Sequence, residues 1–203
     1  MKSFYFSSFN FLKESIGNKK KIALVPGSFK PPHKGHYAMI EHYSKMVGQD
    51  GNIIVFISKP SPKSERKTPD GKVISPEITK KILEIYTKNL PNVSIEISEV
   101  SPVKSCYDIG ERITNGILIF GCSKKDDDIK RFSQIKNYIE SKNPELIVLD
   151  PLTTAVDVTS SGNSAVSASD FRKVFGDIEK MKEFLPDHLN DGEKEQVLNL
   201  LIK

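Results

Sequence analysis

The sequence predicts one α/β domain built on a mainly parallel sheet, and three observations predict it. Five short apolar runs of strand length recur along the chain. Segments with helical periodicity separate consecutive runs, and strands joined through helices make right-handed crossovers that leave the strands parallel. The chain has 203 residues, 37% hydrophobic and 28% charged, which suits a single sizeable core. We therefore expect a doubly wound, five-stranded, Rossmann-like sheet.

The expected strands are continuously apolar, which is typical of strands that helices cover on both faces. They are Lys21–Pro26, Asn52–Ser58, Val93–Ser98, Gly116–Gly121 and Glu145–Asp150. Ligands of such sheets bind beyond the carboxyl ends of the strands. The residues that follow each strand are therefore the first place to look for a site.

The expected helices follow from apolar spacing and from capping residues. Ser75 followed by Pro76 is a strong helix start, because serine caps the first turn and proline suits the first helical position. From Ser167 onward the chain predicts short helices. The other predicted helices are Lys34 to about Val47, a short one at Cys106–Ile113, and one marked by Ile129, Phe132, Ile135 and Ile139.

The predicted domain spans residues 21–203, and residues 1–20 form an N-terminal appendage. Two interpretations of the appendage stay open. Its four phenylalanines favour a short helix docked on the domain. Leu12-Lys13-Glu14 instead resembles the end of short peptides that direct proteins into the heads of some tailed phages.

The composition predicts a cytoplasmic protein, in the host cytoplasm if the gene is viral. No apolar run reaches the length of a membrane span, and the first residues lack the apolar core of a signal peptide. Cys106 and Cys122 are too few for a disulfide framework or a metal motif. We expect no membrane partner and no nucleic acid, and association into a homo-oligomer is left open.

The net charge of +4 is modest but uneven. A basic stretch between the second strand and the following helix reads either as a solvated loop or as a rim that attracts an anionic substrate. Its members are Lys59, Lys63, Arg66, Lys67 and Lys72.

The segment after the first strand carries the densest chemistry. Gly27 permits a tight turn and a close approach of backbone to a ligand. His33 and His36 lie three residues apart at the opening of a helix, so both rings can face the same side. The free N–H groups and partial positive charge of the helix start suit phosphate. Gly35 leaves space where a side chain would block a nucleotide.

This segment resembles the HxGH motif of the nucleotidyltransferase superfamily, the cytidylyltransferase-like fold. The family pattern is G-[ST]-F-D-x-x-H-x-G-H. Lys30 departs from it, because the family usually has an acidic residue there. The matching residues are Gly27, Ser28, Phe29, His33, Gly35 and His36.

A second block, Val166–Arg172, resembles the family segment I-S-S-T-x-[IL]-R. The resemblance implies that a capping serine or threonine starts a helix whose first turn faces a triphosphate, and that the arginine grips the β and γ phosphates. Ser167, Ser169 and Arg172 match in residue type. The planar, paired donors of arginine suit phosphate oxygens.

Two further loops are similar to family segments. Lys63 or Lys59 corresponds to a lysine that reaches substrate phosphate, and the choice between them is open. Gly121 and Ser123 correspond to residues near the adenine and ribose. The acids of 126–128 favour a helix cap over a magnesium site, because adjacent acids at a helix start cannot all face one ion.

The resemblance implies an enzyme that moves a nucleoside monophosphate from a triphosphate, ATP rather than CTP, to a small phosphorylated acceptor. Nicotinamide mononucleotide leads as acceptor, before phosphopantetheine. His33 and His36 would contact the α and β phosphates, Ser28 the phosphate, and Arg172 the leaving pyrophosphate. Mg²⁺ would be held mainly by substrate phosphates and water.

Three alternatives are weighed against this interpretation. A zinc site of His33, His36 and His42 lacks a completing ligand and leaves Gly35 unexplained. A class I aminoacyl-tRNA synthetase also carries HxGH, but this chain is short for one and lacks the K-M-S-K-S partner. A non-catalytic nucleotide-binding or structural protein on the same fold is disfavoured by the intact histidines and Arg172.

Overall fold

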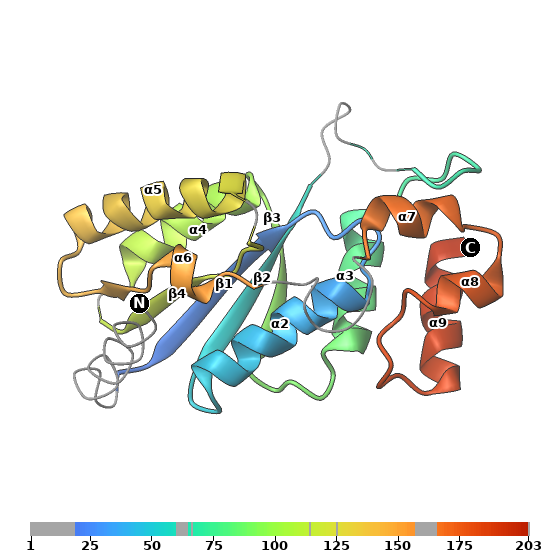
Figure 1. Cartoon of the computed structure of the whole chain (residues 1–203), viewed down its shortest axis with the longest axis horizontal. Helices are drawn as coiled ribbons and strands as arrows, with labels where there is room; N and C mark the ends of the chain where they lie inside the picture. The colour runs from blue at the N-terminus through green and yellow to red at the C-terminus, as the bar shows by residue number, and fades with distance from the viewer. Residues whose placement is uncertain are drawn as a thin grey trace, which may run out of the picture.

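The structure is a computed structural model that describes residues 19–59, 65, 67–113, 115–124, 126–156 and 166–202. Five parallel strands form one sheet in the order β3-β2-β1-β4-β5, with helices on both faces (Figure 1). The elements are β1 Lys21–Gly27, α2 Lys34–Val47, β2 Asn52–Ser58, α3 Pro76–Tyr86, β3 Val93–Ser98, α4 Pro102–Arg112, β4 Ile117–Phe120, α5 Asp126–Lys142, β5 Ile147–Val148, α6 Pro151–Thr154, α7 Ala168–Lys173, α8 Ile178–Lys182 and α9 Asp191–Ile202.

Alternation along each strand divides the core into two layers. Ala23 and Val25 of β1 belong to the layer that α2 and α3 cover, together with buried residues of α9. Leu24, between them, belongs to the layer covered by α4 and α5. Both layers are fully buried at β1, which explains why this strand carries almost no polar residue.

The strand order places the topological switch between β1 and β4. β1 pairs with β2 on one side and with β4 on the other, always in parallel register. The chain leaves β1 toward α2 on one face of the sheet and leaves β4 toward α5 on the opposite face. The loops after β1 and β4 therefore diverge, and a crevice opens between them, where doubly wound folds bind ligands.

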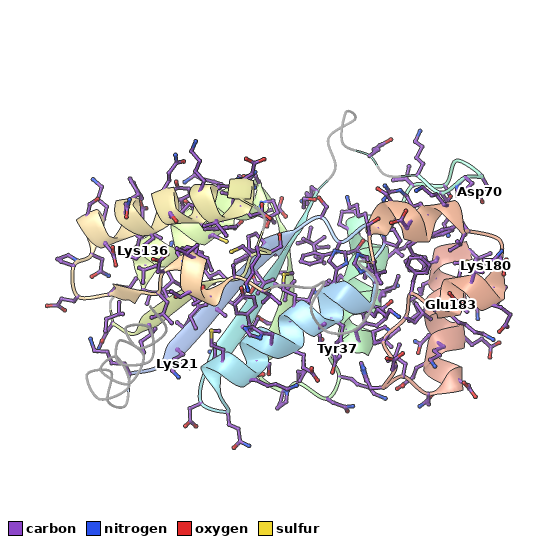
Figure 2. The ribbon with its side chains drawn as sticks, viewed as in Figure 1. Lys21, Tyr37, Asp70, Lys136, Lys180 and Glu183 are labelled. Atoms are coloured by element: carbon purple, nitrogen blue, oxygen red, sulfur yellow. The ribbon has the colours of Figure 1, made fainter. Side chains whose placement is uncertain are left out.

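The C-terminal helices α7, α8 and α9 pack beside α2 and α3 (Figure 1). Phe171 of α7 is fully buried and stacks on Phe184, with ring centroids 4.8 Å apart. The carbonyl of Phe184 accepts a 2.8 Å hydrogen bond from the N–H of Lys34, the first residue of α2. On the next turn Tyr37 packs on His188, where α2 faces this C-terminal unit (Figure 2).

The fold class and most elements are confirmed, with two corrections. Strand β5 is two residues long where Glu145–Asp150 was expected, because the chain turns away to begin α6 at Pro151 with Asp150 as its N-cap. Helix α4 begins at Pro102, four residues before the expected start at Cys106. Ser101 caps it and Pro102 is its first residue, the same signal that correctly predicted α3.

Several sequence features lie outside the described residues, among them Met1–Asn18, Lys63 and Arg66. Within the described part of the chain, no helix is long and apolar enough to cross a membrane. Cys106 and Cys122 are both buried and are not joined in a disulfide, and each packs in the core as a small apolar side chain.

Candidate active site

A cavity of about 440 Å³ opens at the carboxyl ends of β1, β2 and β4. The loop after β1 and the start of α2 form one wall, and the loop after β4 and the start of α5 form another. The described residues that line it are Pro26, Gly27, Ser28, Phe29, His33, Gly35, His36, Met39, Ser58, Pro102, Val103, Gly121, Cys122, Ser123, Asp128, Arg131, Phe132, Val166, Ser167 and Ala168.

His33 and His36 cap the helix that bounds the cavity. His33 is the N-cap of α2, and its Nδ1 accepts a 3.2 Å hydrogen bond from the N–H of Gly35. In return the Nδ1 of His36 accepts a 3.3 Å hydrogen bond from the N–H of His33. The two rings stack with centroids 3.7 Å apart. This is a capping box in which two histidines replace the usual serine and glutamate.

The caps fix the tautomer of each ring. An Nδ1 that accepts from a backbone N–H cannot carry the proton of a neutral imidazole, so that proton lies on Nε2. Burial lowers the pKa of His33 to about 4. Burial, reinforced by His33, holds the pKa of His36 well below its ordinary value. At neutral pH both rings that line the cavity are therefore uncharged, and each carries its proton on Nε2.

Two glycines of the motif have structural reasons that the sequence did not show. A Cβ on Gly35 would lie 3.1 Å from Cε1 and 3.2 Å from Nδ1 of His33, so a side chain there would press on the cap itself. A Cβ on Gly27 would lie 2.6 Å from the Phe29 ring. The expected tight turn belongs to Phe29, whose φ is 53°, and not to Gly27.

The loop after β4 is tied to α2 by a buried tyrosine. The hydroxyl of Tyr43 donates to the carbonyl of Thr154 at 2.9 Å and accepts from the N–H of Cys122 at 3.1 Å. The N–H of Gly121 donates to the carbonyl of Leu24 in β1 at 2.8 Å. These bonds hold the floor of the cavity at a fixed distance from the histidine pair. Gly121 and Ser123 line the cavity, and their contact with an adenine or a ribose stays a prediction.

A polar cluster at the start of α5 forms the wall opposite α2. The hydroxyl of Ser123 donates to Oδ2 of Asp128 at 2.9 Å, and Oδ1 of the same carboxylate lies 3.8 Å from a guanidinium nitrogen of Arg131. At the neighbouring strand ends, the hydroxyl of Ser58 donates to that of Ser28 at 3.3 Å. Ser28 thus lies in the cavity with a hydroxyl partner already beside it.

The second predicted block lies at the edge of the site. Ser167 caps α7 by accepting from the N–H of Asp170, and it lines the cavity. Arg172 donates to the carbonyl of Lys30 at 2.6 Å and to the hydroxyl of Ser169 at 3.0 Å. Neither Arg172 nor Ser169 is among the described lining residues. In this structure Arg172 therefore ties α7 to the loop that carries His33, and its contact with phosphate stays a prediction.

Of the two lysines predicted to reach substrate phosphate, the structure describes only Lys59. Lys59 is exposed at the end of β2 and pairs with Glu99 at 2.5 Å, outside the described cavity lining. Lys63, the other candidate, lies outside the described residues. Lys30, which replaces the family acid, is buried with 3% of its surface exposed.

The described residues contain no group of three His, Cys, Asp or Glu side chains that could hold a metal ion. His42, the third member of the zinc alternative, is exposed on the outer side of α2. The second- and third-strand ends and α5 supplied site residues that the sequence argument missed. The main ones are Ser58, Val103, Arg131 and Phe132, and Asp128 was considered only as a helix cap or a magnesium ligand. A search through the first two turns of the helix after each predicted strand would have found Arg131.

Comparison with known proteins agrees with this architecture. The sequence model of the cytidylyltransferase-like family matches residues 24–174, from within β1 to the end of α7. A probable nicotinate-nucleotide adenylyltransferase of Lactococcus lactis subsp. lactis (strain IL1403) is 29% identical over 84 residues, which cover 41% of this chain and 40% of that protein. One of Bacillus pumilus (strain SAFR-032) is 30% identical over 90 residues, 44% of this chain and 45% of its own. The chain thus matches less than half the length of these relatives.

The matched family region contains both walls of the cavity, the histidine caps of α2 and the start of α7. The sheet order, the site at the switch between β1 and β4, and the sequence match all lead to the same assignment. The chain belongs to the cytidylyltransferase-like family.

Proposed function

We propose that this protein is an adenylyltransferase that transfers AMP from ATP to the phosphate of a pyridine mononucleotide and releases pyrophosphate. The observation that carries the proposal is the stacked His33–His36 pair, whose two Nδ1 atoms are bound by backbone N–H groups. That arrangement presents two Nε2–H donors and a helix start to one cavity, which suits a polyphosphate. The names of the two relatives support a pyridine mononucleotide, nicotinate mononucleotide in particular, as acceptor.

The reaction needs positioning more than acid–base chemistry. An oxygen of the acceptor phosphate attacks the α phosphorus of ATP, a new P–O–P link forms, and the bond from the α phosphorus to the β-phosphate oxygen breaks. Phosphate monoesters lose their second proton near pH 6, so the acceptor is already ionised at neutral pH and no general base is required. Donors that meet the charge developing on the phosphates lower the barrier.

The proposed roles follow the walls of the cavity. The Nε2–H groups of His33 and His36 and the first N–H groups of α2 bind the α and β phosphates. Ser28, whose hydroxyl is 3.3 Å from that of Ser58, contributes a hydroxyl at the same end. Arg172 donates to the carbonyl of Lys30, in the loop between β1 and α2, and lies outside the described cavity lining. Its proposed contact with the leaving pyrophosphate therefore requires the triphosphate to extend past that loop.

A magnesium ion fits this site only as part of the bound triphosphate. Asp128 is a carboxylate of the described lining, but it already accepts from Ser123 and faces Arg131. These residues do not build a metal cage of their own. Mg²⁺ held by phosphate oxygens and water would neutralise charge on the leaving group.

The test is pyrophosphate release by the full-length protein. ATP and CTP are each supplied with nicotinate mononucleotide, nicotinamide mononucleotide or phosphopantetheine, and products are identified by chromatography. We expect release only with ATP and a pyridine mononucleotide, with one dinucleotide formed for each pyrophosphate. If turnover occurs only with CTP, or only with phosphopantetheine as acceptor, the proposed substrates are wrong. Tight ATP binding without turnover on any acceptor would favour the non-catalytic alternative.

A further inference from the structure

The cavity lining contains a positively charged side chain, Arg131, that has no role in the proposed reaction. Its donors on the α2 side are neutral histidines and backbone N–H groups. The opposite side has Asp128 and Arg131, both from the first turns of α5. Among the described residues that line the cavity, Arg131 is the permanently charged cation, because arginine stays protonated at any physiological pH.

The guanidinium of Arg131 has a charged neighbour, and its hydrogen-bond donors are not engaged by that neighbour. Its nearest carboxylate oxygen is Oδ1 of Asp128 at 3.8 Å, which is an ion pair and too long for a hydrogen bond. Within the described part of the chain it makes no hydrogen bond, and about half of its side-chain surface is exposed, 53%. Asp128 is itself fixed by Ser123. The arrangement orients an arginine fork while leaving its donors for a ligand.

Beside Arg131 the wall is apolar. Phe132 has 3% of its surface exposed and stacks on Phe120, with centroids 5.5 Å apart. Pro102 and Val103, from the start of α4, line the cavity next to it. A flat aromatic ring suits such a surface, and a charged substituent on that ring would meet the guanidinium.

We propose that Arg131 binds the ring carboxylate of nicotinate mononucleotide and makes the protein prefer this acceptor over its amide counterpart. The inference rests on the proposed function and assigns one specificity residue to it. A carboxylate accepts both arms of an arginine fork and balances its charge, whereas a carboxamide offers one acceptor and no charge. A site built for the charged group discriminates against the uncharged analogue, because the guanidinium then lacks a charged hydrogen-bond partner and keeps only its 3.8 Å ion pair with Asp128.

The geometry argues against the triphosphate as the ligand of Arg131. The triphosphate has its own donors at the start of α2, on the face of the sheet opposite α5. Asp128 lies 3.8 Å from the guanidinium, and its negative charge opposes a phosphate of charge −2 more than a carboxylate of charge −1.

The test compares acceptors in full-length Arg131→Gln and in a matched control, Lys130→Gln. Lys130 is exposed on the same helix turn, outside the described cavity lining, and its replacement removes the same charge. kcat/KM is measured for nicotinate and nicotinamide mononucleotides, with KM for ATP and the circular dichroism spectrum as checks. We expect Arg131→Gln to lower kcat/KM for the nicotinate form by about tenfold to a hundredfold, the cost of a hydrogen-bonded charge. The nicotinamide form, the KM for ATP and all values of Lys130→Gln should stay close to wild type.

The possible failures are distinct. If wild type uses the pyridine mononucleotides but Arg131→Gln leaves their ratio unchanged, or raises the KM for ATP instead, the assignment of Arg131 is wrong and the proposed function stands. If wild type turns over neither acceptor, the proposed function fails and the assignment of Arg131 fails with it.

Discussion

His36 uses the two nitrogens of its ring for different purposes. Nδ1 accepts from the N–H of His33 and so stabilises the first turn of α2, while Nε2–H is the donor that we propose for a ligand in the cavity that His36 lines. The resemblance of the HxGH motif to a known family predicted that His36 contacts a ligand. It did not predict the hydrogen bond from the backbone, because residue spacing carries no information on which nitrogen faces the backbone. Structural and chemical roles of His36 must therefore be separated by a substitution that keeps one and removes the other.

His36→Asn is that substitution. The asparagine Oδ1 takes the place of Nδ1 as acceptor, so the cap survives, but the distal donor is lost. We expect kcat to fall about a hundredfold or more, the usual effect of removing one such donor, while the melting temperature stays near that of wild type. Turnover and thermal unfolding are measured in parallel with His42→Asn, an exposed histidine on the same helix. Normal turnover in His36→Asn would remove His36 from the proposed mechanism.

At the scale of one element, the start of α2 depends on a histidine being uncharged. His33 is the N-cap, 5% exposed, and a protonated Nδ1 could no longer accept from Gly35. Burial lowers the pKa of His33 to about 4, below the value near 6.5 of the unfolded chain. The unfolded state therefore binds more protons between these values. The stability that neutral His33 contributes to the folded state is complete above about pH 6.5 and is lost as the pH falls toward 4.

The prediction is a pH-dependent difference between wild type and His33→Asn. Asparagine is a good N-cap and does not titrate. Between pH 6.5 and 4, the free energy of unfolding of wild type should fall more steeply, by about 1.4 kcal/mol for each pH unit at most. Urea unfolding at several pH values measures both slopes. Groups remote from His33 titrate alike in both proteins and cancel in the comparison, whereas the pKa of His36 also depends on His33 and is measured separately in each protein. Parallel curves would show that His33 is not held neutral by the fold.

Elements with a local signal at both ends were predictable, and others were not. β2, β3 and α3 have the predicted starts because an apolar run or a Ser-Pro cap marks each of them. β5 is short although its sequence suits a strand, because the chain turns away after it to begin α6 at Pro151. The apolar run alone did not reveal where the strand ends.

At the scale of the whole molecule, the order of the strands could not be predicted from the sequence, for a related reason. All the inner strands are apolar on both faces, so their side chains do not identify their neighbours. The parallel class followed from alternation alone, but the order β3-β2-β1-β4-β5 follows from which helix covers which face. The same limit applies to the site. The histidine wall lies in one short segment and was predicted, whereas the Arg131 wall depends on β4 lying next to β1.

The core of the molecule also extends beyond the region that the family model matches. That match ends at residue 174, yet α8, α9 and the segment between them contribute six buried apolar side chains to the layer under α2 and α3. The N–H of Lys34, at the start of α2, donates to Phe184 in the same segment. The buried residues are Met181, Leu185, Leu189, Val197, Leu198 and Leu201.

A chain that ends at Gly176 should therefore fail to fold, although it contains the whole matched region. Burial of each of the six side chains contributes about 1.5–3 kcal/mol, and their sum reaches the total stability of a typical domain, about 5–15 kcal/mol. We expect no cooperative urea transition and strong binding of a hydrophobic dye. Within α9, Leu198→Ala should cost about 2–5 kcal/mol. Ile202→Ala, at a side chain 44% exposed, should stay within about 0.5 kcal/mol of wild type. Cooperative unfolding of the shortened chain would mean that the catalytic half is stable without α8 and α9, and that these helices are an addition to the domain rather than part of its core.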